Sequence, residues 1–211
     1  MISDERLNQY IDDLIAGRRD ACSAELSRLL DEGTPVREIY ERLFRDSLYE
    51  VGRRWECGAI PIAVEHMATA ITEELLALVL PLAAARSPSG RLAVVSAASG
   101  EFHQLGARIV ADTIELCGWE VHFVGAGAPL DELVRAVRDR KPDLLALSVS
   151  MESHLPNALS AIERVRAVAP RVPIVVGGRA LAHDEPQLDL PGVRRLSSLD
   201  ELVALVKDWP G

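Results

Sequence analysis

The sequence predicts an α/β fold in which an N-terminal four-helix bundle precedes a doubly wound parallel sheet. Two observations favour this fold. Residues 1–85 show apolar residues at helical spacing throughout, whereas residues 90–211 alternate short apolar runs with helical segments. These runs are continuous, which is typical of parallel strands covered on both faces. We therefore expect two domains, 1–85 and 90–211, joined by a linker at Arg86–Gly90.

Four helices with short connections are expected in the first domain, and such a pattern indicates a bundle. The first two helices end at Gly17 and Gly33. Thr34-Pro35 opens the third, as an N-cap followed by proline in the first turn, and this helix runs to about Trp55. Pro61 starts the fourth.

Strands and helices alternate in the second domain. We expect strands at 92–96, 120–124, 143–149, 172–176 and 193–196, and helices at 104–117, 130–138, 155–169 and 198–207. Such alternation predicts a Rossmann-like (flavodoxin-like) doubly wound sheet. In these sheets, ligands bind beyond the carboxyl ends of the strands, so the residues that follow each strand are the candidates for a site.

Composition narrows the class of function. The chain has 211 residues and a formal net charge of -9, which disfavours direct nucleic-acid binding. Cys22, Cys57 and Cys117 lack metal or disulfide spacing and favour a reducing compartment. The polar, acidic N-terminus is no signal peptide, and Pro81 interrupts the longest apolar run, 75–85. We expect a cytoplasmic protein that binds no membrane.

Three loops on one edge of the predicted sheet carry unusual residues. Glu101, Phe102, His103 and Gly106 follow the first strand, Ser148 and Ser150 the third, and Gly177 and Gly178 the fourth. The first loop holds no G-x-G-x-x-G dinucleotide motif, and neither serine stands in a G-x-S-x-G elbow. A neutral imidazole is the commonest nitrogen ligand of transition metals, so His103 is a candidate metal ligand. Glu101 could orient the ring of His103 through a hydrogen bond. A lone histidine ligand suits a metal that a macrocycle already holds.

These motifs resemble the cobalamin-binding Rossmann-like domains, which carry D-x-H-x-x-G, then S-x-L, then G-G. Here E-F-H-Q-L-G is followed after 41 residues by S-V-S, and G-G follows after 26 more. The resemblance implies that His103 replaces the cofactor's dimethylbenzimidazole as lower cobalt ligand. It also implies that the nucleotide tail passes Ser148 and the glycine pair.

The chain departs from this pattern at two positions. Glu101 replaces the usual Asp, and its longer side chain predicts a remodelled or indirect hydrogen bond to His103. Ser150 replaces the usual Leu and changes the tail pocket slightly. We count both residues, with Phe102 and Gly106, among those expected to bind the cofactor.

The bundle carries a further motif, W-E-C-G-A-I-P-I-A-V-E-H, with nine residues between Trp55 and Glu65. This motif resembles the W-x9-E-H cap of CarH-type light-dependent regulators, which hold adenosylcobalamin. The resemblance implies that Trp55, Glu65 and His66 cover the upper face of the corrin. Glu56 replaces the histidine that ligates cobalt after illumination in that family, so a bis-histidine product is not expected unless His66 moves in.

The resemblance implies a cobalamin-binding photoreceptor without a DNA-binding domain, and not an enzyme. Adenosylcobalamin is the expected cofactor, with methylcobalamin as the alternative. Light would change self-association or binding to a separate regulator or signalling protein, with transcription regulation as one output. The main alternative is a corrinoid methyl carrier for a methyltransferase. A plain cobalamin store and an unrelated nucleotide-binding domain are further alternatives.

Overall fold

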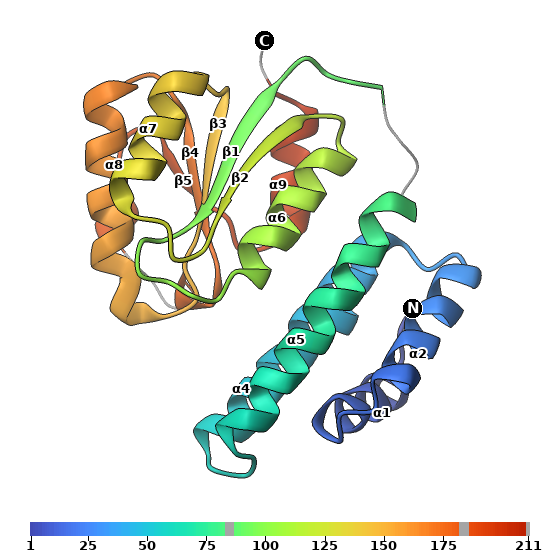
Figure 1. The fold of residues 1–211 in the computed structure, drawn as a ribbon. Helices are drawn as coiled ribbons and strands as arrows, with labels where there is room; N and C mark the ends of the chain where they lie inside the picture. The colour runs from blue at the N-terminus through green and yellow to red at the C-terminus, as the bar shows by residue number, and fades with distance from the viewer. Residues whose placement is uncertain (83–86, 182–185, 210–211) are drawn as a thin grey trace. The chain divides into compact units, whose positions relative to one another are not determined.

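The computed structural model describes residues 1–82, 87–181 and 186–209 (Figure 1). The chain divides into two compact units, Met1–Ala84 and Ala85–Gly211. The expected end of the bundle, residue 85, lies outside the described residues. So does Arg86, the first residue of the expected linker at Arg86–Gly90. No helix within the described ranges is long and apolar enough to cross a membrane.

The first unit is helical, as predicted. Its helices are α1 (Asp4–Ile15), α2 (Arg19–Asp31), α3 (Val36–Glu38), the π-helix η1 (Ile39–Asp46), α4 (Ser47–Glu56), α5 (Ile62–Val79) and the short 3-10 helix η2 (Leu80–Leu82). The segments α3, η1 and α4 follow one another without a break and together form the predicted third helix. The four-helix prediction is therefore confirmed, with a π-helical segment in the middle of the third helix.

The expected N-cap at Thr34 is wrong. The N-cap of α3 is Pro35, which makes no side-chain capping bond. Thr34 lies just beyond α2, and its backbone N–H donates to the Leu29 carbonyl at 2.9 Å at the end of that helix. A threonine between two helices can hydrogen-bond to the end of the first or cap the start of the second. Here its backbone N–H satisfies a carbonyl at the end of α2.

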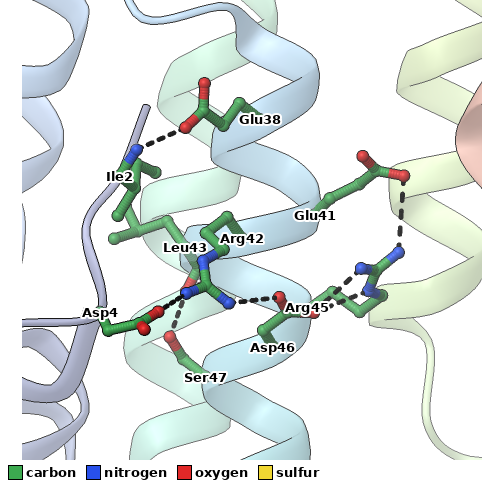
Figure 2. Close-up of polar contacts among 9 residues, drawn as sticks. All are labelled: Ile2, Asp4, Glu38, Glu41, Arg42, Leu43, Arg45, Asp46 and Ser47. Atoms are coloured by element: carbon green, nitrogen blue, oxygen red, sulfur yellow. Dashed lines mark hydrogen bonds and ion pairs between the residues drawn. The ribbon is translucent and has the colours of Figure 1, made fainter.

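Polar contacts connect the N-terminal segment to the third helix (Figure 2). The Ile2 N–H donates to the Glu38 carboxylate at 2.5 Å, and Arg42 pairs with both Asp4 and Asp46. Ion pairs at the surface contribute little to stability, so these contacts mainly fix where the segment lies. The apolar core supplies the larger share of the stability of this unit. Its largest fully buried side chains are Tyr10, Leu14, Leu29, Ile39, Tyr40, Leu43, Phe44 and Leu76.

The second unit is a five-stranded parallel sheet in the order β2-β1-β3-β4-β5. Its strands are β1 (Leu92–Ala97), β2 (Glu120–Gly125), β3 (Leu144–Ser148), β4 (Ile174–Gly177) and β5 (Val193–Arg195). Its longer helices are α6 (Leu105–Leu116), α7 (Leu130–Arg140), α8 (Leu155–Val168) and α9 (Leu199–Lys207). This strand order is the flavodoxin-like one, which confirms the predicted fold class.

Helices cover both faces of the sheet. In Figure 1, α7 and α8 lie on one side of the strands, and α6 and α9 lie on the other. Three short 3-10 helices, η3 (Glu152–His154), η4 (Arg179–Leu181) and η5 (Pro186–Leu188), lie in the described connections. The two-sided cover explains why β1 and β3 are almost fully buried, as the continuous apolar runs predicted.

The strand order reverses between β1 and β3. From β1 the chain moves outward to β2, and it then returns to the other side of β1 to form β3. The carboxyl ends of three strands are in register there, because Ala97 pairs with Ser148 and Ser148 with Gly177. Loops after neighbouring strands diverge at such a switch point and leave a crevice for a ligand.

Candidate functional site

A buried carboxylate, Glu101, is the centre of the site. Its side chain is 0% exposed, and it accepts hydrogen bonds from two loops. One oxygen, Oε1, accepts the backbone N–H of His103 at 3.1 Å and the ring Nδ1 of the same residue. The other, Oε2, accepts the N–H groups of Ser150 and Met151 at 3.1 and 3.2 Å and lies 3.0 Å from Nδ1 of His154. The predicted Glu101–His103 hydrogen bond is therefore direct.

The hydrogen bonds keep Glu101 charged. Burial raises the pKa of its carboxyl, but the hydrogen bonds from His103 and His154 outweigh burial and hold the pKa well below its usual range. An ionised carboxylate only accepts hydrogen bonds, so the proton of each ring lies on Nδ1. In neutral His103 the ring's lone pair is then on Nε2. The ring is 56% exposed.

This donor set fits a single imidazole ligand to a cobalt ion held in a corrin. A histidine whose Nδ1–H is held by a carboxylate presents Nε2 in a fixed tautomer and orientation, which is the usual arrangement behind a metal-bound imidazole. The remaining ligands would come from the macrocycle. The site therefore suits a preassembled cofactor.

Two of the predicted glycines allow close approach at the same edge. A β-carbon on Gly106 would lie 2.9 Å from Ser148 Oγ, so the residue is small enough for the serine to pack against α6. Gly178 has φ +119, and a β-carbon there would lie 2.2 Å from the Val149 carbonyl oxygen. The sheet edge itself thus requires glycine at 178, whatever passes beside it.

The other predicted residues of the second unit contribute differently. Gly177 ends β4, and a β-carbon there would lie 3.2 Å from the Leu196 carbonyl oxygen. Ser150 contributes its backbone N–H, through the bond to Glu101 described above. Phe102 is exposed, and its ring lies over Gly127, where a β-carbon would come within 3.3 Å of Cε1. Phe102 therefore offers an apolar surface beside the histidine.

In the first unit, Trp55, Glu65 and His66 lie on one helical hairpin. Trp55 is in the last turn of α4 and is 39% exposed, unusually high for a tryptophan. It lines a shallow hollow of about 580 Å³ with residues 58–62. Glu65, in the first turn of α5, accepts a hydrogen bond from Thr69 Oγ1 at 3.1 Å and lies 2.7 Å from His66 Nδ1. An indole surface and polar groups are thus presented near one end of the bundle.

The sequence reasoning missed His154. This residue comes four positions after Ser150, just before α8, and no ligand or catalytic motif contains it. The sheet topology brings it to Glu101, because β1 and β3 are neighbours and end at the same level. Its position after a strand end was the only signal that pointed to it.

Known families match both units. A family model for a B12 binding domain matches residues 91–195, and a second model of the same description matches residues 6–80. The matched ranges contain the histidine loop, the serine and glycine positions, and the Trp55 hairpin.

Two kinds of relative are similar along most of the chain. A dimethylamine corrinoid protein of Methanosarcina barkeri is 28% identical over 84% of this chain and 85% of its own length. The HTH-type transcriptional repressor CarA of Myxococcus xanthus is 28% identical over 86% of this chain, and the match covers 62% of the repressor. The chain is homologous to both groups.

A solved structure confirms the fold. The monomethylamine corrinoid protein of Methanosarcina barkeri superposes with a TM-score of 0.79 over 98% of this chain and 99% of that one, at 17% identity.

Proposed function

The chain is built from two B12-binding domains, and from this premise we propose that it is an adenosylcobalamin-binding light sensor. The observation that carries the cobalamin part is the buried Glu101 carboxylate bonded to Nδ1 of His103. With Nδ1 engaged by Glu101, Nε2 of His103 is the nitrogen that can bind a metal. His103 lies at the switch point of the sheet, where this fold binds small molecules.

Each predicted site residue of the second unit has a role in this proposal. His103 would hold cobalt through Nε2, and Glu101 would fix the tautomer of its ring. Ser148, Ser150, Gly177 and Gly178 border the crevice that takes the displaced nucleotide tail, and Gly106 keeps α6 close to Ser148. The exposed ring of Phe102 packs against the cofactor.

The first unit supplies the light response. When bound, adenosylcobalamin provides a cobalt–carbon bond that visible light breaks. Trp55 would stack on the adenosyl group and Glu65 would accept hydrogen bonds from its ribose, while His66 supports Glu65 through their 2.7 Å contact. These contacts would exist only while the adenosyl group is bound, so they would favour one conformation in the dark and lose that preference in the light. The output is altered self-association or altered binding to a separate regulator or signalling protein.

The W-x9-E-H motif and the similarity to CarA and CarH support light sensing. The test is reconstitution with adenosylcobalamin and with methylcobalamin in darkness, followed by absorption spectra and hydrodynamic radius before and after green light. A light-dependent change in both readouts is expected. Identical radius and absorption in dark and light would contradict the sensor.

The second candidate is a corrinoid methyl carrier, which the similarity to dimethylamine corrinoid proteins favours. A carrier needs repeated access to the upper face of the corrin, which a stacked Trp55 obstructs. The discriminating experiment offers reduced cobalamin-loaded protein to a corrinoid methyltransferase and its methylamine. Methylation of the bound corrinoid at a rate that Trp55→Ala does not change would favour the carrier.

A further inference from the structure

Glu101 has two histidine partners, and each holds a different oxygen. His103 occupies Oε1 through its ring and its backbone N–H. His154 lies 3.0 Å from Oε2, and the backbone N–H groups of Ser150 and Met151 donate to the same oxygen. The two oxygens of the carboxylate therefore contact different loops. Oε1 contacts the loop that carries His103, and Oε2 contacts the loop after β3.

The position of His154 is well defined. It ends the 3-10 helix η3, and its backbone N–H donates to the Met151 carbonyl at 2.9 Å. Its side chain is 24% exposed, so most of the imidazole is packed. Nδ1 is the ring nitrogen within hydrogen-bond distance of Glu101 Oε2, the oxygen that also accepts two backbone N–H groups.

A glutamate needs more restraint than an aspartate to present an oxygen at one point. Its additional methylene adds a rotatable bond, and each rotor must be fixed for the carboxylate to meet Nδ1 of His103 in one geometry. Removing the residue that hydrogen-bonds a metal ligand changes metal affinity by about 10–100-fold, and Glu101 is that residue for His103.

We propose that His154 is a positioning residue for the cobalt ligand. It holds Oε2 of Glu101 so that Oε1 remains on Nδ1 of His103 and Nε2 remains directed at the metal. This inference rests on the proposed cobalamin binding and adds a second histidine to the support of the lower ligand.

His154 could instead act only as a tether between the two loops. Asn157 provides the matched control, because its Nδ2 donates to the Ser99 carbonyl at 2.7 Å. That bond also connects the segment after β3 to the loop after β1. It does so through the backbone, and the Glu101 carboxylate takes no part in it. Removing the Asn157 bond weakens the tether and leaves the Glu101 contacts in place.

The experiment compares His154→Leu, His154→Asn and Asn157→Leu in the full chain, loaded with adenosylcobalamin in darkness. The amide nitrogen of asparagine sits one bond from Cγ, as Nδ1 does, so His154→Asn keeps a donor near Oε2. The readout is the visible absorption of the bound cofactor, which differs with and without a nitrogen ligand below cobalt.

In His154→Leu we expect the ligation equilibrium to shift about tenfold towards cobalamin without a lower nitrogen ligand. His154→Asn and Asn157→Leu should retain the wild-type spectrum. His154→Phe keeps a ring without the donor and replaces the leucine variant if that variant does not fold.

Two results would overturn the inference: a wild-type spectrum in the variants without a donor, or an equal shift in Asn157→Leu. Both leave cobalamin binding by the wild type intact, so they contradict only the role of His154. A wild-type protein that binds no cobalamin, or binds it without a protein nitrogen ligand, contradicts the proposed function instead.

Discussion

Glu101 determines how His103 is presented, because both its oxygens are engaged and neither is solvated. A carboxylate that is fully buried needs several donors to remain charged, and five N–H groups from two loops provide them. The charge in turn fixes the proton of His103 on Nδ1. A change at Glu101 should therefore alter how His103, the proposed cobalt ligand, is presented, although His103 itself is unchanged.

We predict that Glu101→Gln lowers the affinity for adenosylcobalamin by about 10–100-fold. The amide brings an N–H₂ group into a pocket lined by donors and removes the charge that holds Nδ1–H. Affinity is measured by absorbance titration in darkness. Glu115→Gln, which alters a partly buried carboxyl on α6, should bind like the wild type. Unchanged affinity of Glu101→Gln would contradict the role of the carboxylate.

At this scale, the sequence indicated the Glu101–His103 pair but not its full surroundings. The pair lies two residues apart in one loop, so spacing reveals it. His154 is separated from Glu101 by 53 positions, and only the pairing of β1 with β3 brings the two together. The backbone donors of Ser150 and Met151 have no side-chain signature at all.

Strand ends set the shape of the site at the scale of elements. The loop after β4 passes so close to the loop after β3 that Gly178 has no room for a side chain. The resemblance to cobalamin-binding domains implies that the glycine pair leaves space for a nucleotide tail. The structure adds an independent reason for glycine at 178, namely contact with the Val149 backbone.

Gly178→Ala should therefore destabilise the second unit strongly. Its β-carbon would meet a backbone oxygen at 2.2 Å, and its φ of +119 is unfavourable for alanine. The matched control is Gly192→Ala, where φ is +73 and the nearest atom is an arginine nitrogen at 3.8 Å. We expect the control to lose about 1–2 kcal/mol of unfolding free energy and Gly178→Ala to lose more. Urea unfolding measures both, and equal losses would contradict the close approach.

Helices of the bundle were easy to predict where the spacing of apolar residues is regular. Helix boundaries were hard to predict where hydrogen bonds of polar residues set them. The helices α1, α2 and α5 follow from their apolar spacing. The start of α3 does not, because Thr34 bonds to Leu29 in the helix before it. The π-helical segment η1 lies inside a regular apolar pattern, and that pattern does not distinguish it from an α-helix.

Glu50 on α4 gives the bundle a pH dependence. Hydrogen bonds from Arg53 and then Arg54 lower the pKa of its carboxyl from 4.5 to about 2. A lowered pKa means that the folded state favours the charged form. The contribution of Glu50 to the free energy of unfolding is therefore complete above the pKa of the unfolded state and is lost as the pH falls through about 2.

We predict that Glu50→Gln is less stable than the wild type near neutral pH and that the difference shrinks as the pH falls from about 5 to about 2. Other carboxyl groups titrate alike in both proteins, so the difference isolates Glu50. The measurement is the urea midpoint of both proteins at each pH. A difference that stays constant over this range would contradict the assignment.

At the scale of the whole molecule, family models for a B12 binding domain match both parts of the chain, and both kinds of relative are similar along most of its length. The two-part organisation was visible in the sequence, since the helical spacing gives way to alternating strands and helices. The choice between sensor and carrier was not, because both classes of relative are similar to this chain over most of its length. That choice depends on what the Trp55 hairpin does when the cofactor is bound.

Trp55→Ala tests the sensor directly. We expect the variant to bind adenosylcobalamin with a wild-type lower ligand, because His103 lies in the other unit. We also expect its hydrodynamic radius to become the same in dark and light, because the stacked contact is gone. Leu78→Ala removes another exposed apolar side chain of the bundle and should keep the light response. A light response that survives in Trp55→Ala would count against the stacking role.

The central claim is that a protein imidazole, His103, ligates cobalt below the corrin. The most direct measurement uses protein grown with ¹⁵N-labelled histidine and loaded with unlabelled cobalamin, reduced to the paramagnetic Co(II) state for electron paramagnetic resonance. We predict that the nitrogen splitting of the cobalt lines changes from triplets to doublets on labelling, and that His103→Ala abolishes these doublets. Triplets that persist in the labelled protein would place the cofactor's own benzimidazole on cobalt and contradict the account.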